Sequence, residues 1–507
     1  MNNIFKISKD GKTLLKCLGK NIKEGIIPDG ITIIGEEAFY GCNALQNIKI
    51  PNNVTEIREF AFYGCTSLTS IDIPDSVTTI KSGAFCHCNA LLHFDIPSSV
   101  TEIENSAFDG CKMLKSIHIP NSVTTIGSRA FEGCTSLHSI DIPSSIRKIE
   151  NNTFKACSSL QSIDIPNSVI EISKSAFEEC STLKNIDIPS SVTTIGDSAF
   201  CRCKELQSID IPNSVTLIGA NAFSGCKELR SINIPSSVTT IGEDAFMYCE
   251  SLQCIDISID NQNYTSLDGI LYDKDLKTII KYPCKKENDK YNIPKSVTTV
   301  WHNAFFGCKT LKNIDIPSSV ITIKSGAFRY CNALLNIDIP SSITTIEPGT
   351  FHGCNTLQSI DIPNSVTTIG FGAFNACKAL KRIVIPNNLS IIEEGTFGGC
   401  EALQSIDIPN SITTIEKEAF WGCETLQNID IPDSVTEIGE FAFGGCTALQ
   451  SIHIHLVEIE KANIANDAFY GIDTDNCVLY IPPGTRWAYR HHPVFGKFKN
   501  IEIEKQK

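Results

Sequence analysis

A phrase of 23 residues repeats along most of this chain, and it limits the fold more than any other feature of the sequence. One copy, TIGSRAFEGCTSLHSIDIP, occupies Thr125 to Pro143, and its cysteine recurs 17 times in the context F-x-x-C. The spacing is 23 residues from Cys42 to Cys249 and again from Cys308 to Cys446. A fixed period of this length indicates stacked units, because one unit alone cannot bury its apolar side. The sequence therefore predicts a solenoid.

The apolar side chains of one unit alternate as they do in a β-strand. In LQSIDIP, which begins at Leu160, the leucine and the two isoleucines point inward and the residues between them point outward. One such strand per coil pairs in register only as a parallel sheet. Proline follows nearly every strand and ends the ladder, because it has no N–H to donate. The segment VTTIG predicts a second short extended segment on the opposite side, and SRAFEGC predicts a short helical or 3₁₀ turn.

The cysteines follow the repeat. Of the 23 cysteines, 17 occupy one column, and the total is odd. Equivalent residues of adjacent coils lie about 4.8 Å apart with parallel Cβ vectors, an orientation that does not suit a disulfide. We therefore expect buried, reduced thiols that pack as small apolar groups. The phenylalanine column, Phe39 through Phe443, is expected to form the centre of the core.

Composition and charge exclude several classes of protein. The chain is 42% hydrophobic and 20% charged, which is enough to bury a long core. Its net charge of −14 argues against a general binder of nucleic acid or of anionic membranes. The opening residues, MNNIFKISKDGKTLLKC, contain no apolar h-region, and no run of about 18 apolar residues follows, so we expect neither a signal peptide nor membrane insertion.

The pattern I-P-x-S-V-T-x-I-G-x-x-A-F-x-G-C-x-x-L resembles the BspA-like class of leucine-rich repeats, found in surface proteins of anaerobic and mucosal bacteria and of some mucosal protozoan parasites. The resemblance covers about 90% of the chain. It implies a mainly β, right-handed leucine-rich-repeat solenoid with terminal caps, no enzyme activity, and binding of host or matrix proteins. Surface members usually carry an export signal, so the location expected here stays open between the cytoplasm and the cell surface.

The array is interrupted once. The interval between Cys249 and Cys308 is 59 residues, and it contains LDGILYDKDLKTIIKYP, a hairpin pattern. Within it, KDLKTIIK (274–281) matches KDGKTLLK (9–16) at five of eight positions. Because solenoid ends must cover the core and stop edge pairing, we infer two cap-plus-array modules, with a dedicated ligand loop as the alternative for the insert. The predicted divisions are an N-terminal cap hairpin (1–27), a first array (28–257), an insert hairpin (258–292), a second array (293–455), and a last partial repeat with the C-terminal cap (456–507).

No enzyme motif stands out. P-loop, H-E-x-x-H, G-x-S-x-G and EF-hand patterns are all missing from the sequence. The local clusters of ligand-type side chains are Cys86 with Cys88, Cys201 with Cys203, and His453 and His455 with His491 and His492. Two thiolates fall short of the four ligands that zinc normally takes. We therefore expect no cofactor and no metal, and we keep an enzyme site at the insert or the C-terminal cap as a minor alternative.

The outward residue between the two isoleucines is the candidate for partner binding. It is aspartate at positions Asp72, Asp95, Asp141, Asp164, Asp187, Asp210, Asp256, Asp315, Asp338, Asp361, Asp407 and Asp430. Carboxylates about 4.8 Å apart repel one another, so this column predicts an acidic strip that attracts cations or basic partners. The alternative is that duplication copied one solvated aspartate.

These features together predict a non-enzymatic protein-binding scaffold, adhesin-like, that presents an extended acidic sheet face to a macromolecular partner. At about 4.8 Å per coil the 17 coils and their caps span on the order of 90 Å. The alternative is an intracellular or injected effector-type interaction scaffold. The expected partner is a protein and not a nucleic acid, and the oligomeric state stays open.

Overall fold

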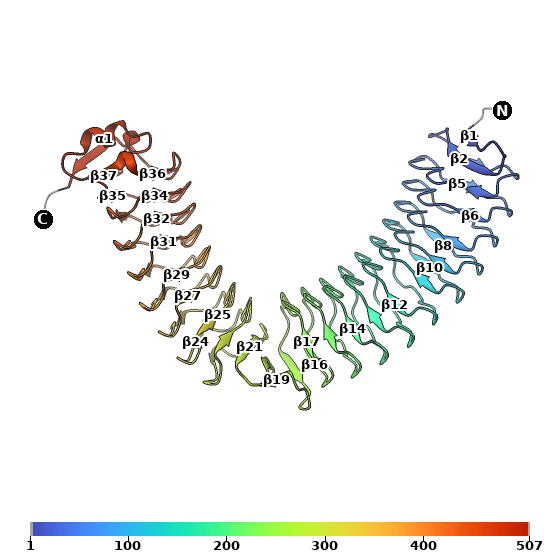
Figure 1. The fold of residues 1–507 in the computed structure, drawn as a ribbon, viewed down its shortest axis with the longest axis horizontal. Helices are drawn as coiled ribbons and strands as arrows, with labels where there is room; N and C mark the ends of the chain where they lie inside the picture. Colours follow the sequence, from blue (N-terminus) through green and yellow to red (C-terminus); the bar gives the residue numbers. More distant parts are fainter. Residues whose placement is uncertain (1–3, 505–507) are drawn as a thin grey trace. The chain divides into compact units, whose positions relative to one another are not determined.

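The computed structural model describes residues 4–504, and it confirms a mainly β solenoid. The chain divides into two compact units between Asn263 and Tyr264. Within each unit every repeat forms one coil, and consecutive coils stack with parallel strands in register (Figure 1). Among residues 4–504, no helix is long and apolar enough to cross a lipid bilayer.

In the first unit the longer ladders of backbone hydrogen bonds run along the segment of each coil that corresponds to VTTIG. This segment is rich in β-branched residues, and we call its surface the β-branched side. Strand Glu171–Ile172 pairs with Thr194–Ile195 at an offset of one repeat, and its isoleucine faces the core. One sheet contains β1 (Phe5–Ile7), β2 (Thr13–Cys17), β4 (Ile33–Ile34), β6 (Glu56–Ile57), β7 (Thr79–Ile80), β9 (Glu102–Ile103) and β11 (Thr125–Ile126). The next contains β12 (Lys148–Ile149), β13 (Glu171–Ile172), β14 (Thr194–Ile195), β15 (Leu217–Ile218) and β17 (Thr240–Ile241).

The IDIP segments of the coils stack into a surface that we call the strand face, and their hydrogen bonding is less regular. In the first unit β3 (Glu24–Ile26) pairs with β5 (Asn47–Lys49), β8 (His93–Asp95) with β10 (Ser116–His118), and β16 (Ser231–Ile234) with β18 (Cys254–Ile257). In the coils between β10 and β16, single parallel β-bridges join Asp141 to Asp164, Asp164 to Asp187 and Asp187 to Asp210. The sequence predicts the main parallel sheet on the strand face, but the hydrogen-bond ladder on the β-branched side is longer. Proline directly after nearly every IDI limits the strand-face ladder.

The second unit repeats both ladders. Its β-branched side contains β19 (Tyr264–Leu267), β20 (Ile270–Asp273), β21 (Thr278–Lys281), β23 (Thr299–Val300), β25 (Thr322–Ile323), β27 (Thr345–Ile346), β29 (Thr368–Ile369), β31 (Ile391–Ile392), β32 (Thr414–Ile415), β34 (Glu437–Ile438) and β36 (Asn463–Ile464). Its strand face contains β22 (Lys290–Asn292), β24 (Asn313–Asp315), β26 (Asn336–Ile337), β28 (Ser359–Ile360), β30 (Arg382–Ile383), β33 (Asn428–Ile431), β35 (Ser451–Ile454), β37 (Val478–Ile481) and β38 (Asn500–Ile503).

Both units begin with the same change of strand direction. In the first, β1 pairs antiparallel with β2, and β2 then pairs parallel with β4. In the second, β19, β20 and β21 pair antiparallel in turn, and β21 then pairs parallel with β23. We propose that each hairpin caps its array, because an antiparallel strand occupies the sheet edge that the first coil would otherwise expose.

The segment around A-F in each coil, Ser128 to Cys134 in one copy, forms turns, and the stacked turns make a surface that we call the turn face. The N–H groups of Arg129, Phe131 and Gly133 donate to carbonyls 22 residues ahead, in the next coil, at 2.7–2.9 Å. The N–H group after each of them donates to the carbonyl three residues back, at 3.1–3.2 Å. A helix needs consecutive N–H groups to bond within the segment, so the predicted helical or 3₁₀ turn becomes a series of separate turns.

The phenylalanine column forms the centre of the core, as predicted. Phe108, Phe131 and Phe154 have no exposed surface. Their rings stack with centroids 5.5 and 5.7 Å apart and planes within 2° of parallel. Each large buried side chain contributes roughly 1.5 to 3 kcal/mol to folding.

The cysteine column makes a hydrogen bond that the sequence pattern did not reveal. The Cys134 thiol donates to the Phe108 carbonyl at 3.2 Å, and the same bond recurs from Cys65 to Cys249 and from Cys331 to Cys446 at 3.1–3.3 Å. No disulfide joins any of the 23 cysteines, all of which lie within residues 4–504. Burial raises the pKa of Cys134 well above its ordinary value. The column thus links coils through a protonated thiol.

The serine column after the proline also bonds turn backbone. Ser122 Oγ donates to the Val100 carbonyl at 2.7 Å, and Ser168 Oγ donates to the Ile146 carbonyl at 2.6 Å. Each acceptor lies in the preceding coil. The hydroxyl therefore satisfies a carbonyl that would otherwise be left unpaired between coils.

The C-terminal end closes the second unit with η1 (Ile459–Lys461), α1 (Arg486–His491) and η2 (Phe495–Lys497). Of four aromatic residues in this cap, Tyr489, Phe495 and Phe498 are buried. The Tyr489 hydroxyl donates to the Leu456 carbonyl at 2.8 Å. The fourth, Trp487, is 72% exposed on α1.

Replacing Phe131 by alanine is expected to lower the free energy of unfolding by about 3 to 5 kcal/mol, because it opens a cavity in a closely stacked column. Hydrogen exchange should show lost protection in the coils beside residue 131 and unchanged protection in the second unit, because coils contact only their neighbours. Phe131→Leu, which retains more volume, is the control and should cost less. Equal loosening of both units would contradict two separate modules.

Thiol labelling of the native protein is expected to be fast at few positions, because only Cys201 and Cys254 are partly exposed. Denaturation without reductant should make all 23 thiols react. Cys201→Ser should remove one of the fast groups and leave the slow population unchanged. If most thiols stay blocked until reductant is added, the column is bridged and the thiol-to-carbonyl ladder is wrong.

Candidate interaction surfaces

The aspartates predicted to bind a partner all lie on the strand face, and all twelve are exposed. The structure brings four of them together most directly, because parallel bridges join their backbones from Asp141 to Asp210. The column is interrupted by His118 and Asn233 in the first unit and by Val384 in the second. At its C-terminal end Asp430 accepts a hydrogen bond from His455 Nε2 at 2.6 Å.

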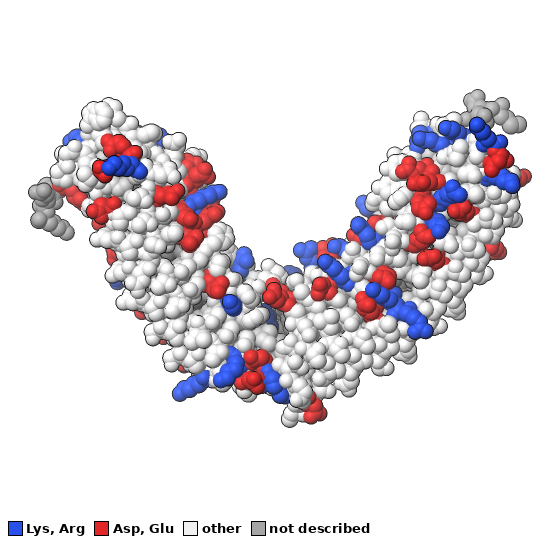
Figure 2. Space-filling model, in the orientation of Figure 1, with Lys and Arg blue, Asp and Glu red and all other residues white. Residues whose placement is uncertain are grey.

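Charges outside this column are mostly mixed. On the face drawn in Figure 2, Lys and Arg side chains lie beside Asp and Glu side chains along both units. Many of these contacts join equivalent positions of neighbouring coils, such as Lys81 Nζ with Glu104 Oε1 at 2.7 Å and Lys155 Nζ with Glu178 Oε2 at 3.0 Å. Pairs of this kind neutralise one another. The aspartate column therefore differs from its surroundings in repeating one sign of charge.

The turn face was not singled out from the sequence, although it carries most of the exposed aromatic side chains. Within residues 4–504, six aromatic residues are strongly exposed, and five of them belong to turn segments: Tyr40, Tyr248, Phe371, Trp421 and Tyr470. The residues flanking A-F differ from coil to coil, whereas the strand face repeats one residue. That variation among otherwise near-identical copies is the signal that identifies this face in the sequence.

Some turn-face residues occupy a backbone conformation that favours glycine. The second residue after the column phenylalanine is usually glycine with positive φ, as at Gly133 (φ +70°). Large side chains replace it at Arg202 (φ +60°), Tyr248 (φ +57°) and Tyr330 (φ +57°). A non-glycine residue in this region costs roughly 1 to 2 kcal/mol. Strain of this kind is often retained where a side chain has a function.

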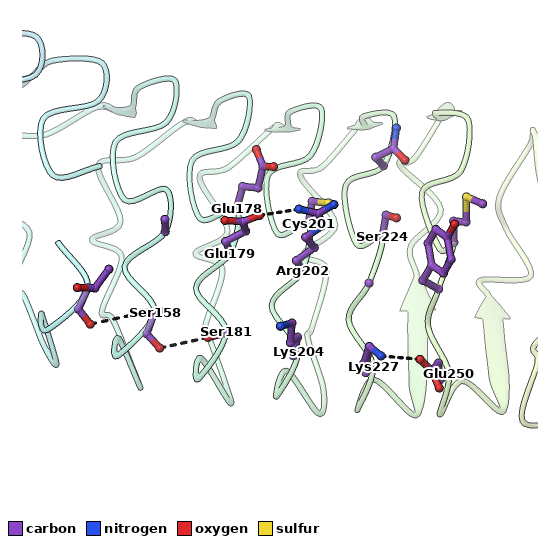
Figure 3. Close-up of a pocket in the computed structure, with 16 residues that line it drawn as sticks. Ser158, Glu178, Glu179, Ser181, Cys201, Arg202, Lys204, Ser224, Lys227 and Glu250 are labelled. Atoms are coloured by element: carbon purple, nitrogen blue, oxygen red, sulfur yellow. Dashed lines mark hydrogen bonds and ion pairs between the residues drawn. The ribbon is translucent and has the colours of Figure 1, made fainter. Parts of the chain in front are cut away.

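A groove of about 840 Å³ follows the turn face of the first unit (Figure 3). Its charged walls are largely paired across coils. Arg202 Nη1 contacts Glu179 Oε1 at 2.6 Å, and Lys227 Nζ contacts Glu250 Oε1 at 2.7 Å. Half-buried Cys201 also lines the groove, and burial raises the pKa of its thiol. The acidic and basic side chains that line this groove balance one another, so it is close to neutral.

The predicted histidine cluster only partly assembles. Glu504 contacts both His453 Nδ1 and His455 Nδ1 at 3.1 Å, and the His453 ring stacks on Tyr480 with centroids 4.4 Å apart. His491 and His492 instead lie at the end of α1, where they bond nearby backbone groups. His453 on β35 and His455, which directly follows that strand, therefore hold Glu504, the residue after β38.

The basic residues near the C-terminus also stabilise the cap. Arg486 donates to the Ile501 carbonyl at 3.0 Å, Arg490 to the Lys499 carbonyl at 3.4 Å, and Lys497 to the Asn466 carbonyl at 3.2 Å. Lys499 contacts Asp475 at 2.6 Å. Each thus has a partner within the cap.

No metal centre is present among the side chains of residues 4–504: no three or more His, Cys, Asp or Glu residues lie where they could hold one ion. In both cysteine pairs one thiol is the inward ladder residue, bonded to a phenylalanine carbonyl, as with Cys88 and Cys203. The second thiol, Cys86 or Cys201, belongs to the turn segment. Neither pair gathers further ligands.

Comparison with solved structures identifies similar solenoids. A leucine-rich cell surface protein of Faecalibacterium prausnitzii is 32% identical, with 80% of this chain and 92% of that chain covered and a TM-score of 0.57. A leucine-rich repeat protein of Bacteroides ovatus is 30% identical, with 76% and 93% covered and a TM-score of 0.51. A leucine-rich repeat protein of Eubacterium ventriosum is 27% identical, with 61% and 83% covered and a TM-score of 0.51. No curated protein matches the chain.

The sequence also matches a family model described as the BspA type leucine rich repeat region (6 copies). The matched stretches are residues 16–138, 80–207, 124–253, 193–280, 277–401 and 367–480. Together they cover nearly the whole chain, including both units. The resemblance that the coil phrase carried is thereby confirmed, and the chain belongs to the BspA-type leucine-rich-repeat family.

Proposed function

We propose that this protein is a non-enzymatic, adhesin-like binding scaffold whose strand face recognises a basic region of a macromolecular partner. The observation that carries the proposal is the exposed aspartate column, which repeats one charge at the same position of successive coils. A leucine-rich-repeat solenoid typically serves as an interaction scaffold and not as an enzyme.

The geometry of the strand face favours a long partner surface. Adjacent strands lie about 4.8 Å apart, so four bridged aspartates place four carboxylates within roughly 15 Å along the stack. A small ligand would neutralise one or two of them. A lysine- or arginine-rich segment can follow the column and relieve the repulsion between its members.

The rigid backbone adds to this complementarity. Ile140, Ile163, Ile186 and Ile209, which precede the aspartates of the bridged stretch, are buried. Their packing fixes the register of the strand face before a partner arrives, so little ordering entropy is lost in binding. The cell surface description of the Faecalibacterium relative supports a role in contact with other molecules outside the cell.

Replacing Asp164, Asp187 and Asp210 by lysine should abolish the negative strip where the parallel β-bridges make it most regular. We expect the affinity for a fluorescent octalysine peptide to fall at least tenfold, and wild-type binding to weaken with added salt, because salt screens surface charge beyond about 8 Å at physiological ionic strength. Fluorescence anisotropy measures both effects. Thermal unfolding should change little, since exposed substitutions usually cost less than about 0.5 kcal/mol each.

The matched control replaces Glu102, Glu228 and Glu243 by lysine. It makes the same change in net charge on exposed residues of the same unit that lie outside the aspartate column. Octalysine affinity should fall less than threefold in this control. Equal losses in the two triple variants would show that only net charge matters and would overturn the strand face as the binding surface.

A further inference from the structure

The turn face of the second unit carries a groove that differs in charge from the rest of the chain. It has a volume of about 470 Å³ and spans four coils, from His302 to Asn375. Its lining includes Arg329, His302 and His352 but no aspartate or glutamate. In a chain with a net charge of −14, a groove with cationic and no anionic lining is an exception.

Arg329 lines this groove and lacks a counter-charge. Its Nε is buried and has no hydrogen-bond partner among the residues that the structure describes. No carboxylate of those residues forms an ion pair with it. Its contact is with the Tyr330 ring, whose centre lies 5.1 Å from Arg329 Cζ. An arginine in this position has donors left for a ligand.

The neighbouring groups hold the positive side of the groove in place. Tyr330 adopts the glycine-favouring conformation (φ +57°), and its ring lies where a Cβ on Gly353 would come within 2.5 Å. The Tyr330 hydroxyl contacts His352 Nε2 at 3.2 Å. Burial first, and then the positive charge of Arg329, lowers the pKa of His352. The strained tyrosine thus supports both Arg329 and His352.

The carboxylate beside the groove is already paired. Glu347 contacts Lys324 Nζ at 3.7 Å and accepts a hydrogen bond from Ser325 Oγ at 3.4 Å. It therefore leaves the charge of Arg329 largely uncompensated. In the groove of the first unit, by contrast, Arg202 is neutralised by Glu179 at 2.6 Å.

We infer that this groove, around Arg329, His302, His352 and Phe371, binds an acidic side chain of a partner protein. A carboxylate matches the guanidinium fork in shape and charge. Phe371 is 57% exposed at the groove wall and offers an apolar surface to the residues beside the carboxylate. Arginine and aromatic residues together are the side chains most often dominant in protein interfaces.

The groove has room for an inserted side chain together with the residues beside it. Its volume of about 470 Å³ lies within the range of small-ligand sites. This site lies on a different face from the aspartate column and prefers the opposite charge. Its failure would leave the proposed function of the strand face intact.

The test uses the full chain and a fluorescent peptide of three Glu-Tyr-Glu-Ala repeats, with a peptide in which glutamine replaces every glutamate as the probe control. Fluorescence anisotropy should show at least tenfold weaker binding of the glutamine peptide. Arg329→Gln should weaken binding of the glutamate peptide at least tenfold, and Arg329→Lys should weaken it less, because lysine keeps the charge but loses the fork. Unchanged thermal unfolding checks that both variants fold.

The matched control variant is Arg382→Gln, which removes an exposed arginine from the strand face of the same unit. It should change the affinity less than twofold. Equal effects of Arg382→Gln and Arg329→Gln would overturn the site as a specific one. Tighter, Arg329-dependent binding of a heparin oligosaccharide than of the peptide would overturn the assignment to an acidic protein side chain in favour of a sulfated glycan.

Discussion

The alternating hydrogen bonds of the turn segment are the constraint on which the rest of this solenoid depends. Around Phe131 every second N–H donates to the next coil and the others donate three residues back. The segment cannot wind into a helix, because half of its donors serve the neighbouring coil. It therefore contributes a third intercoil ladder beside the two strand ladders. A single backbone hydrogen bond contributes only about 0.5 to 1.5 kcal/mol, so stability comes from repetition.

This register places like side chains directly above one another. Phe108 and Phe131 stack with nearly parallel rings, and the Cys134 thiol donates to the Phe108 carbonyl beside them. That carbonyl also accepts the Cys111 N–H of its own coil at 3.2 Å. A buried carbonyl with two donors leaves no unpaired polar atom at the centre of the stack. The cysteine column is therefore a structural element of the core, and its chemistry as a thiol is suppressed by burial, which raises the pKa of Cys134.

The strand face and the turn face differ in how much their exposed side chains vary from coil to coil. The strand face repeats aspartate, which supplies a field and a length but little discrimination among basic partners. The turn face varies from coil to coil and exposes residues such as Tyr248, Phe371 and Trp421. Varied aromatic and arginine side chains are what interfaces use for selectivity. A scaffold with both surfaces can combine electrostatic attraction with local recognition.

The period of 23 residues by itself determined the solenoid, the parallel strands, the inward phenylalanine and cysteine columns and the outward aspartates, because each follows from spacing and from the alternation of side chains in a strand. Only the tertiary structure decided which ladder is continuous, that the A-F segment is turn and not helix, and that thiols of the cysteine column bond the phenylalanine carbonyl 26 residues earlier. It also decided that Glu504 joins His453 and His455 while His491 and His492 lie elsewhere, and that Arg329 has no counter-charge. The physical reason is distance in the sequence. Local patterning acts over a few residues, whereas these contacts join residues 22 to 51 positions apart. The missing counter-charge of Arg329 likewise depends on which side chains the stacked coils bring beside it.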